Sequence, residues 1–115
     1  TGMNRLFHHD GERASSRAAE KYGCYYSLST LSSVSIEEIG KLVDSPKMYQ
    51  IYIHKDRGLT YEFIERCKRA KFTSLCLTID TIVAGNRERD LRTGMTMPPK
   101  FTPSSLLAYY PSETP

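Results

Sequence analysis

The sequence predicts an α/β fold in which parallel strands are covered by helices, forming an arc of a (β/α)8 barrel. Short apolar runs, typical of strands buried on both faces, alternate with amphipathic stretches typical of helices. The apolar runs begin near residues 25, 48 and 74, a steady spacing with short connections, which favours parallel strands joined by helices. A whole barrel of this type takes about 250 residues. The 115 residues therefore predict about three strands with their helices and a long C-terminal loop.

The first predicted elements are a helix over residues 11–22 and a strand over residues 24–29. The helical segment is rich in helix formers, and Gly23 follows it as the left-handed residue that often ends a helix. The strand is short, aromatic and β-prone. Residues 1–10 show no regular pattern and are expected to be irregular.

A capping signal and a proline delimit the second helix. Ser35 and Glu38 have the spacing of a capping box, which predicts a helix from there to about Val43. Pro46 ends this helical region. The next apolar run, residues 47–53, is the second predicted strand.

The third helix and strand follow the same pattern. A helix over residues 60–70 places Phe63, Ile64 and Cys67 on one face. The third predicted strand, residues 74–80, is apolar almost throughout. It completes the predicted three-stranded parallel sheet.

The periodic pattern stops after residue 83. Residues 84–115 are charged and then proline-rich, and we expect a long loop with one helical turn near Leu106. Loops of this length are either functional or disordered, and both interpretations stay open. The predicted organisation is one barrel domain, with βα units over 1–83 and an active-site loop region over 84–115.

Charge and hydropathy exclude several classes of protein. Sixteen basic and thirteen acidic residues leave a net charge of +3, too balanced to favour nucleic-acid binding. The basic run within residues 66–71 is expected to be a solvated helix face. No apolar run approaches the roughly 20 residues of a membrane span, and no basic-then-apolar leader opens the chain.

The cysteine pattern favours free thiols. Cys24, Cys67 and Cys76 are odd in number and lack metal-site spacing. Cys67 and Cys76 fall at apolar positions, so we expect both to be buried. Free thiols suit a reducing cytoplasm.

The histidines do not predict a metal centre or a catalytic base. The run of His8, His9 and Asp10 has the residue types of a metal site, but adjacent histidines point in different directions in most backbones, so a solvated loop is favoured. His54 is expected to serve the loop after its strand. The chain also lacks the glycine-rich patterns that cradle phosphates.

Polar residues gather at the predicted carboxyl ends of the strands, where βα barrels place their active sites. They are Ser29, Gln50, Tyr52, Thr78 and Asp80. We expect the amide and hydroxyl groups to bind a polar heterocycle, Tyr52 to donate to an anionic substrate, and Asp80 to orient a histidine or hold a cation. Arg87 follows in a loop, where its planar fork suits a carboxylate. The alternatives are strand-end side chains bonded to neighbouring turns and, for Asp80, a helix cap.

Several linked runs of sequence resemble the FMN-dependent α-hydroxy acid dehydrogenase and oxidase family. The matching runs are TGM at 1–3, SLST at 27–30, YQIY at 49–52, HKDR at 54–57, LTIDT at 77–81 and GNRERD at 85–90. They occur in the family's order and spacing and cover nearly the whole chain up to about Pro99. Members of the family include L-lactate dehydrogenase, glycolate oxidase and mandelate dehydrogenase.

The resemblance implies a fragment of an FMN-binding barrel domain and assigns roles to the strand-end residues. Thr1 and Gly2 are expected to lie beside the flavin ring. Ser29, Gln50 and Thr78 are expected to bond the polar edge of the flavin. The cofactor implied is therefore FMN, and no metal is implied.

The resemblance also implies oxidation of an L-2-hydroxy acid to a 2-oxo acid. Tyr52 is expected to touch the substrate, Arg87 to bind its carboxylate, and Asp80 to pair with a catalytic histidine. Gly2 and the run 86–90 favour the dehydrogenase members of the family. Lactate is the expected substrate, with mandelate or glycolate as alternatives. In the family, the histidine takes a proton and the flavin accepts the hydride equivalent.

Some of the family's groups have no counterpart in this sequence, namely the histidine base, the second substrate arginine, the flavin-adjacent lysine and the phosphate-binding segment. We therefore expect the isolated chain to be inactive. The parent enzyme that contains it is expected to be a homo-oligomer. The alternative is a non-catalytic assembly fragment that pairs through its open sheet edges. The expected location is cytoplasmic, with peripheral contact at the inner membrane left open.

Overall fold

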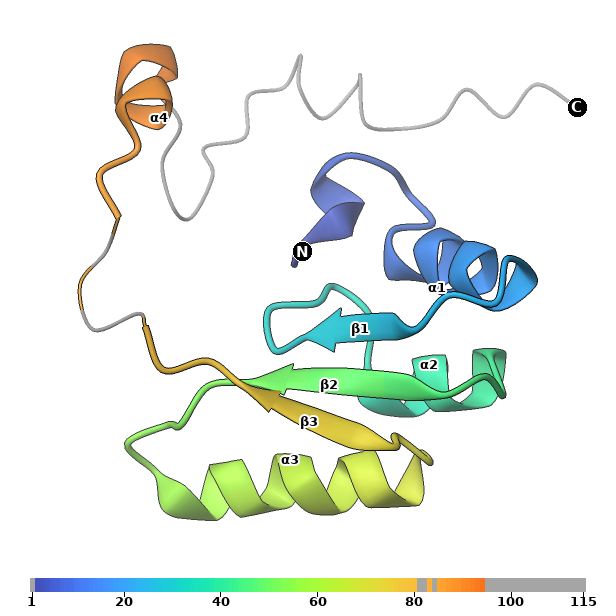
Figure 1. Cartoon of the computed structure of the whole chain (residues 1–115). Coiled ribbons are helices and arrows are strands. Elements are labelled where there is room, and N and C mark those ends of the chain that lie inside the picture. Colours follow the sequence, from blue (N-terminus) through green and yellow to red (C-terminus); the bar gives the residue numbers. More distant parts are fainter. Residues whose placement is uncertain (1, 81–82, 84, 95–115) are drawn as a thin grey trace, which may run out of the picture. The chain divides into compact units, whose positions relative to one another are not determined.

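The computed structural model describes residues 2–80, 83 and 85–94. They belong to two compact units, whose boundary along the sequence lies between Ile79 and Asp80. The first unit contains, in order, η1 (Asn4–Leu6), α1 (Glu12–Lys21), β1 (Tyr26–Ser29), α2 (Ile36–Leu42), β2 (Lys47–Ile51), α3 (Arg57–Arg69) and β3 (Ser74–Leu77). The described part of the second unit contains α4 (Glu88–Thr93). Figure 1 shows the three strands of the first unit side by side, with helices beside them.

The strands form a parallel sheet in the order β1-β2-β3. In the register, Leu28 lies opposite Tyr49, Ser29 lies opposite Gln50, and Gln50 lies opposite Cys76. Each connection between neighbouring strands contains a helix, as parallel pairing requires. The predicted α/β arc with three parallel strands is confirmed, and the sheet is open within the described residues.

One face of the sheet is buried under helices. Leu28 and Tyr49 from the strands pack in one buried cluster with Ile36 and Ile39 of α2 and Cys67 of α3. Alternate residues of a strand point to opposite faces, so this row of side chains faces the helices. Cys67 is 3% exposed, which confirms the predicted buried thiol. Its burial raises the pKa of the thiol to about 11.

The other face and the β3 edge are covered only in part within the first unit. Ser27 and Cys76 are exposed on the face away from the helices. The expectation that Cys76 is a buried thiol is therefore wrong, because it lies on the partly covered face of an edge strand. On the helix side, Leu75 is 43% exposed and Leu77 is 50% exposed. Apolar exposure of this kind is typical of a sheet that continues into further structure.

Side-chain caps set the beginnings of two helices. Ser35 Oγ accepts from the backbone N–H of Glu38 at 3.2 Å, which confirms the predicted cap of α2. Asp56 Oδ1 accepts from Gly58 N at 2.8 Å, so α3 begins at Arg57 and not near residue 60 as predicted. The missed signal was Asp56, which is a favoured N-cap residue.

The structure corrects several other predicted boundaries. The irregular segment 1–10 contains η1, and the strands predicted over 47–53 and 74–80 end earlier, at Ile51 and Leu77. The region 84–115, predicted as a loop, contains α4. The helical turn expected near Leu106 lies outside the described residues. Gly23 has the predicted left-handed conformation, with φ of 66°.

Helices α2 and α3 are held together by a close backbone approach and an ion pair. A Cβ built on Gly40 would lie 2.7 Å from Ala70 Cβ and 2.8 Å from the Ala70 carbonyl oxygen. Arg66 binds Glu37 through two hydrogen bonds, Nε to Oε1 at 2.7 Å and Nη2 to Oε2 at 2.8 Å. The Arg66 guanidinium lowers the pKa of Glu37 to about 2.

The close approach at Gly40 makes this position intolerant of a side chain. We expect Gly40→Ala to lower the free energy of unfolding by about 1–3 kcal/mol, because a backbone carbonyl cannot easily move away. The gain in helix propensity of about 1 kcal/mol offsets only part of this cost. Gly85→Ala, where no atom lies within 4 Å of the added Cβ, is the control in urea unfolding. A Gly40→Ala chain as stable as the control would contradict the packing described.

The Glu37–Arg66 pair makes stability depend on pH. Since the folded-state pKa of Glu37 is about 2 and its ordinary value is 4.5, the pair stabilises the fold above pH 4.5, and this contribution is lost as the pH falls towards 2. Glu37 is 46% exposed, so we expect about 1 kcal/mol or less. The difference in unfolding free energy between wild type and Glu37→Gln should shrink from pH 7 to pH 2.5. A constant difference would contradict the role of this pair, and Glu62→Gln on α3, the helix of Arg66, is the control.

Candidate functional site

Three polar side chains lie at the carboxyl end of the sheet. Ser29 is the last residue of β1, Gln50 is the penultimate residue of β2, and Thr78 directly follows β3. The Thr78 backbone N–H donates to Ile51 O at 3.0 Å, which extends the pairing of β2 and β3 by one more bond. The three side chains therefore meet at the edge of the sheet where βα barrels bind their ligands, as the sequence predicted.

The three side chains form one connected hydrogen-bond chain. Ser29 Oγ donates to Gln50 Oε1 at 3.1 Å, and Gln50 Nε2 donates to Thr78 Oγ1 at 2.7 Å. Two backbone amides join the chain: Thr30 N donates to Gln50 Oε1 at 3.2 Å, and Leu31 N donates to Ser29 Oγ at 3.1 Å. The Thr30 hydroxyl donates to Gln50 O at 2.6 Å. The amide of Gln50 thus bridges all three strands.

The two backbone amides fix the direction of this chain, because an amide N–H can only donate. Ser29 Oγ accepts from Leu31 N, and because Thr30 N donates to Gln50 Oε1, the Ser29 hydroxyl donates its proton to the same oxygen. Thr30 N and Ser29 together require the oxygen of the Gln50 amide on their side, so the NH2 group faces Thr78. Thr78 accepts that bond and keeps its own O–H to donate. Among the described residues, the second N–H of Gln50 and the O–H of Thr78 make no further hydrogen bond, so both remain donors.

The N-terminal segment lies against the loop that follows β1. Met3 N donates to Leu31 O at 2.8 Å. A Cβ on Gly2 would lie 2.8 Å from the same Leu31 oxygen, so only glycine fits this close approach without a shift. Gly2 therefore lies against Leu31, whose own N–H donates to Ser29 in the hydrogen-bond chain. Thr1, predicted beside it, lies outside the described residues.

The remaining predicted residues make no hydrogen bond to Ser29, Gln50 or Thr78 among the described residues. Tyr52 is partly buried just beyond the end of β2. His54 serves its own loop as expected, since its backbone N–H donates to Thr60 Oγ1 at 3.2 Å. Asp80 and Arg87 belong to the second unit, where both are exposed and Arg87 precedes α4. The predicted roles of Tyr52, Asp80 and Arg87 remain predictions.

Sequence reasoning missed the residues that hold the chain in place. Thr30 and Leu31 act through backbone amides, which any residue type supplies, so no residue pattern could indicate these two bonds. The Thr30 hydroxyl adds a bond to Gln50 O, for which its place directly after the strand was the available signal. Glu12 was counted only as a helix former, yet its carboxylate accepts from Ser33 and Asn4 across the fold. These partners are 21 and 8 residues away along the chain.

Two other features were considered as sites. His8, His9 and Asp10 offer ligand atoms within 4.8 Å of one another, but His8 Nδ1 already accepts from Asp10 N at 3.3 Å, and both histidines are exposed. The exposure agrees with the expected solvated loop. The expectation that the adjacent histidines point in different directions is wrong, because their ring centroids lie 4.3 Å apart.

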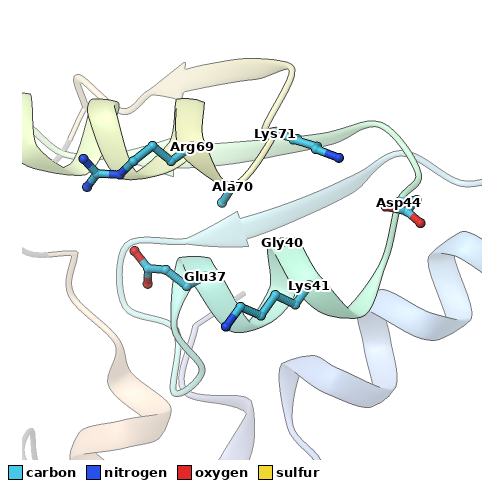
Figure 2. A pocket seen from close by; sticks show the side chains of 7 residues that line it. All are labelled: Glu37, Gly40, Lys41, Asp44, Arg69, Ala70 and Lys71. Carbon is cyan, nitrogen blue, oxygen red and sulfur yellow. The ribbon is translucent and has the colours of Figure 1, made fainter.

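A groove of about 520 Å³ lies at the C-terminal ends of α2 and α3, lined by Glu37, Gly40, Lys41, Asp44, Arg69, Ala70 and Lys71. Figure 2 shows that its basic side chains point in different directions and do not converge on one point. Positive charge beside helix C-termini is expected from the helix dipole. The groove is also at the end of the sheet away from Gln50, since Asp44 and Lys71 precede β2 and β3.

The described helices were also compared with the length and apolarity that a membrane span requires. None of those within residues 2–80 and 85–94 meets both requirements.

The chain is similar to known proteins over most of its length. Residues 1–114 match the family model described as FMN-dependent dehydrogenase. An L-lactate oxidase of Nostoc sp. is 46% identical over 98 residues, covering 82% of this chain and 27% of that protein. Glycolate oxidase 1 of Zea mays is 35% identical over 102 residues, covering 89% of this chain and 28% of that protein. This chain thus spans about a quarter of the length of these relatives.

Solved structures give the same result for the fold. The crystal structure of a monotopic membrane protein, (S)-mandelate dehydrogenase, superposes with a TM-score of 0.79 at 32% identity, covering 93% of this chain and 28% of that chain. The similar solved structures are barrel flavoenzymes, which confirms the predicted arc of a (β/α)8 barrel.

The buried end of the hydrogen-bond chain should matter most for stability. We expect Ser29→Ala to lower the free energy of unfolding by about 1–3 kcal/mol, because it leaves Leu31 N without its acceptor and removes a donor to Gln50. Ser27→Ala is the matched control, since Ser27 lies on the same strand but is exposed. Equal unfolding free energies for the two variants would show that the hydrogen-bond chain contributes nothing to the stability of the fold.

Proposed function

This chain belongs to the FMN-dependent dehydrogenase family, and we propose that the protein containing it oxidises an L-2-hydroxy acid to the 2-oxo acid with FMN as cofactor. The observation that carries the proposal is the hydrogen-bond chain through Gln50, which presents donors at the carboxyl end of the sheet. FMN supplies the electron acceptor for such an oxidation. Every other role proposed here belongs to residues of this chain.

The strand-end residues are proposed to bind the polar edge of the flavin. The free N–H of Gln50 and the O–H of Thr78 suit the carbonyl oxygens of a flavin, since both are donors. Ser29 holds the Gln50 amide in the orientation that makes this match. The backbone at Gly2, and by family likeness Thr1, is proposed to lie beside the ring. The donor set of the structure therefore fits FMN.

Substrate binding is proposed for residues just beyond the strands. Tyr52 has a phenol that donates to a carboxylate or hydroxyl oxygen. Arg87 is proposed to bind the substrate carboxylate through its planar fork. Asp80 is proposed to orient a histidine base and stabilise its protonated form, as a carboxylate does beside other histidine bases. These three roles rest on the family motifs that contain the residues.

L-Lactate is the proposed substrate. The run 86–90 and glycine at position 2 favour the dehydrogenase members of the family, and an L-lactate oxidase is among the similar proteins. The alternative substrates are glycolate and mandelate, which are named in other relatives. The protein is proposed to be a cytoplasmic homo-oligomer, with peripheral contact at the inner membrane as an alternative suggested by the monotopic relative.

A second proposal, of another class, is that this chain acts as an assembly fragment. It is favoured by the exposed apolar side chains of the β3 edge, Leu75, Leu77 and Ile79, of which Ile79 is 76% exposed. Such an edge is a template for pairing with another chain. Sedimentation that stays monomeric over a wide concentration range would contradict it.

An FMN titration tests the proposed cofactor site in the 115-residue chain. We expect saturable quenching of flavin fluorescence, and no bleaching when L-lactate is added, because no histidine of the chain occupies the family's base motif. Thr78→Val should raise the dissociation constant about five- to tenfold through the loss of one donor. Thr73→Val, at the opposite end of β3, is the control.

The outcomes of this titration test the flavin site, the missing base and the Thr78 contact separately. Absence of quenching would contradict an assembled flavin site in this chain. Bleaching by lactate would show that the chain contains a competent base. Equal effects of the two threonine variants would contradict the proposed contact of Thr78.

A further inference from the structure

Glu12 has an unusual environment for a carboxylate in the first turn of a helix. Its side chain is fully buried, with 0% exposure. Oε1 accepts from Asn4 N at 3.1 Å and from Ser33 N at 3.0 Å, and Oε2 accepts from Ser33 Oγ at 2.6 Å. These donors belong to η1 and to the loop after β1, and not to α1 itself. The carboxylate therefore joins three separate segments.

The same two segments meet again closer to the strand ends. Arg5 N donates to Ser33 Oγ at 3.1 Å, and Met3 N donates to Leu31 O at 2.8 Å. Residues 2–5 thus lie along residues 31–33, with Glu12 bonded to both. Leu31 in turn donates its own N–H to Ser29. Hydrogen bonds of Asn4, Met3 and Leu31, joined by short stretches of backbone, therefore connect Glu12 to the hydrogen-bond chain through Gln50.

The partners of Glu12 are neutral donors, and none of them within the described residues is a cation. Burial raises the pKa of Glu12, but the hydrogen bonds from Ser33 and Asn4 outweigh this and leave the pKa below its ordinary value of 4.5. The group is therefore a buried anion near neutral pH. A buried anion without hydrogen-bond donors is costly, so the carboxylate holds its donors in place.

We propose that Glu12 is a positioning residue of the flavin site, whose carboxylate clamps residues 2–4 against the loop 31–33. The clamp sets where the Gly2 backbone lies relative to Ser29 at the end of β1. The inference rests on the proposed FMN site for its functional consequence. The clamp itself is a property of the fold.

The same helix supplies a matched comparison. Glu20, near the other end of α1, also accepts from two backbone amides, Asp44 N at 2.7 Å and Ser45 N at 3.0 Å. These amides precede β2, at the end of the sheet away from Gln50. Glu20→Ala therefore removes a similar clasp without touching the proposed flavin site.

The test combines amide hydrogen exchange with FMN affinity, measured on the 115-residue chain. In Glu12→Ala we expect exchange at Met3, Asn4 and Ser33 to rise at least about tenfold, and the FMN dissociation constant to rise by a similar factor. Glu20→Ala should speed exchange near Asp44 only and change FMN affinity less than about twofold.

Two conservative variants separate positioning from stability and keep the test decisive if Glu12→Ala fails to fold. Glu12→Gln keeps the length of the side chain and one oxygen for the two backbone amides, so it should retain most FMN affinity. Glu12→Asp keeps the charge but shortens the reach, so it should bind FMN as weakly as Glu12→Ala. Amides of α3 should exchange at the wild-type rate in every folded variant.

The proposal is overturned if exchange at Met3 is unchanged in Glu12→Ala or Glu12→Asp, or if Glu20→Ala weakens FMN binding as much as either. Failure of the proposed function is distinguishable. A wild-type chain that does not bind FMN contradicts that function, and exchange at Met3 and Ser33 alone then decides whether the clamp exists.

Discussion

The geometry of the candidate site depends on one side-chain amide. Gln50 lies on the central strand of the described sheet and bonds to both neighbours, through Ser29 on one side and Thr78 on the other. Parallel pairing brings the ends of the three strands to one edge, but pairing alone does not fix the direction of a polar side chain. The backbone amides of Thr30 and Leu31 do so, because they cannot accept. The result is an edge that presents donors in a set orientation.

The open sheet has a physical cost that bears on how this site is maintained. One sheet face is covered by α2 and α3, whereas the other face and the β3 edge are partly exposed within the first unit. Whole domains are stable by only about 5–15 kcal/mol. Hydrogen bonds such as those accepted by Glu12 are therefore large relative to the stability of the strand-end region. A chain that spans about a quarter of its relatives retains these hydrogen bonds within its own residues.

The sequence predicted the parallel strands and the cluster of Ser29, Gln50 and Thr78, because apolar periodicity and strand-end position follow directly from the order of residue types. Boundaries were less predictable: α3 begins earlier through the Asp56 cap, and β3 ends before Thr78. The exposure of Cys76 could not be read from an apolar run, since an edge strand and a central strand have similar composition. The role of Glu12 depends on contacts formed only on folding.

The most direct test of this account is the NMR spectrum of the Gln50 side-chain amide. The account predicts two well-separated NH2 proton resonances, one of them protected by its bond to Thr78, because Ser29 and Thr30 hold the oxygen on the opposite side. Addition of FMN should shift the other resonance selectively. Two resonances at the positions of a freely rotating, solvent-exposed glutamine, unchanged by FMN, would contradict both the fixed hydrogen-bond chain and the site built on it.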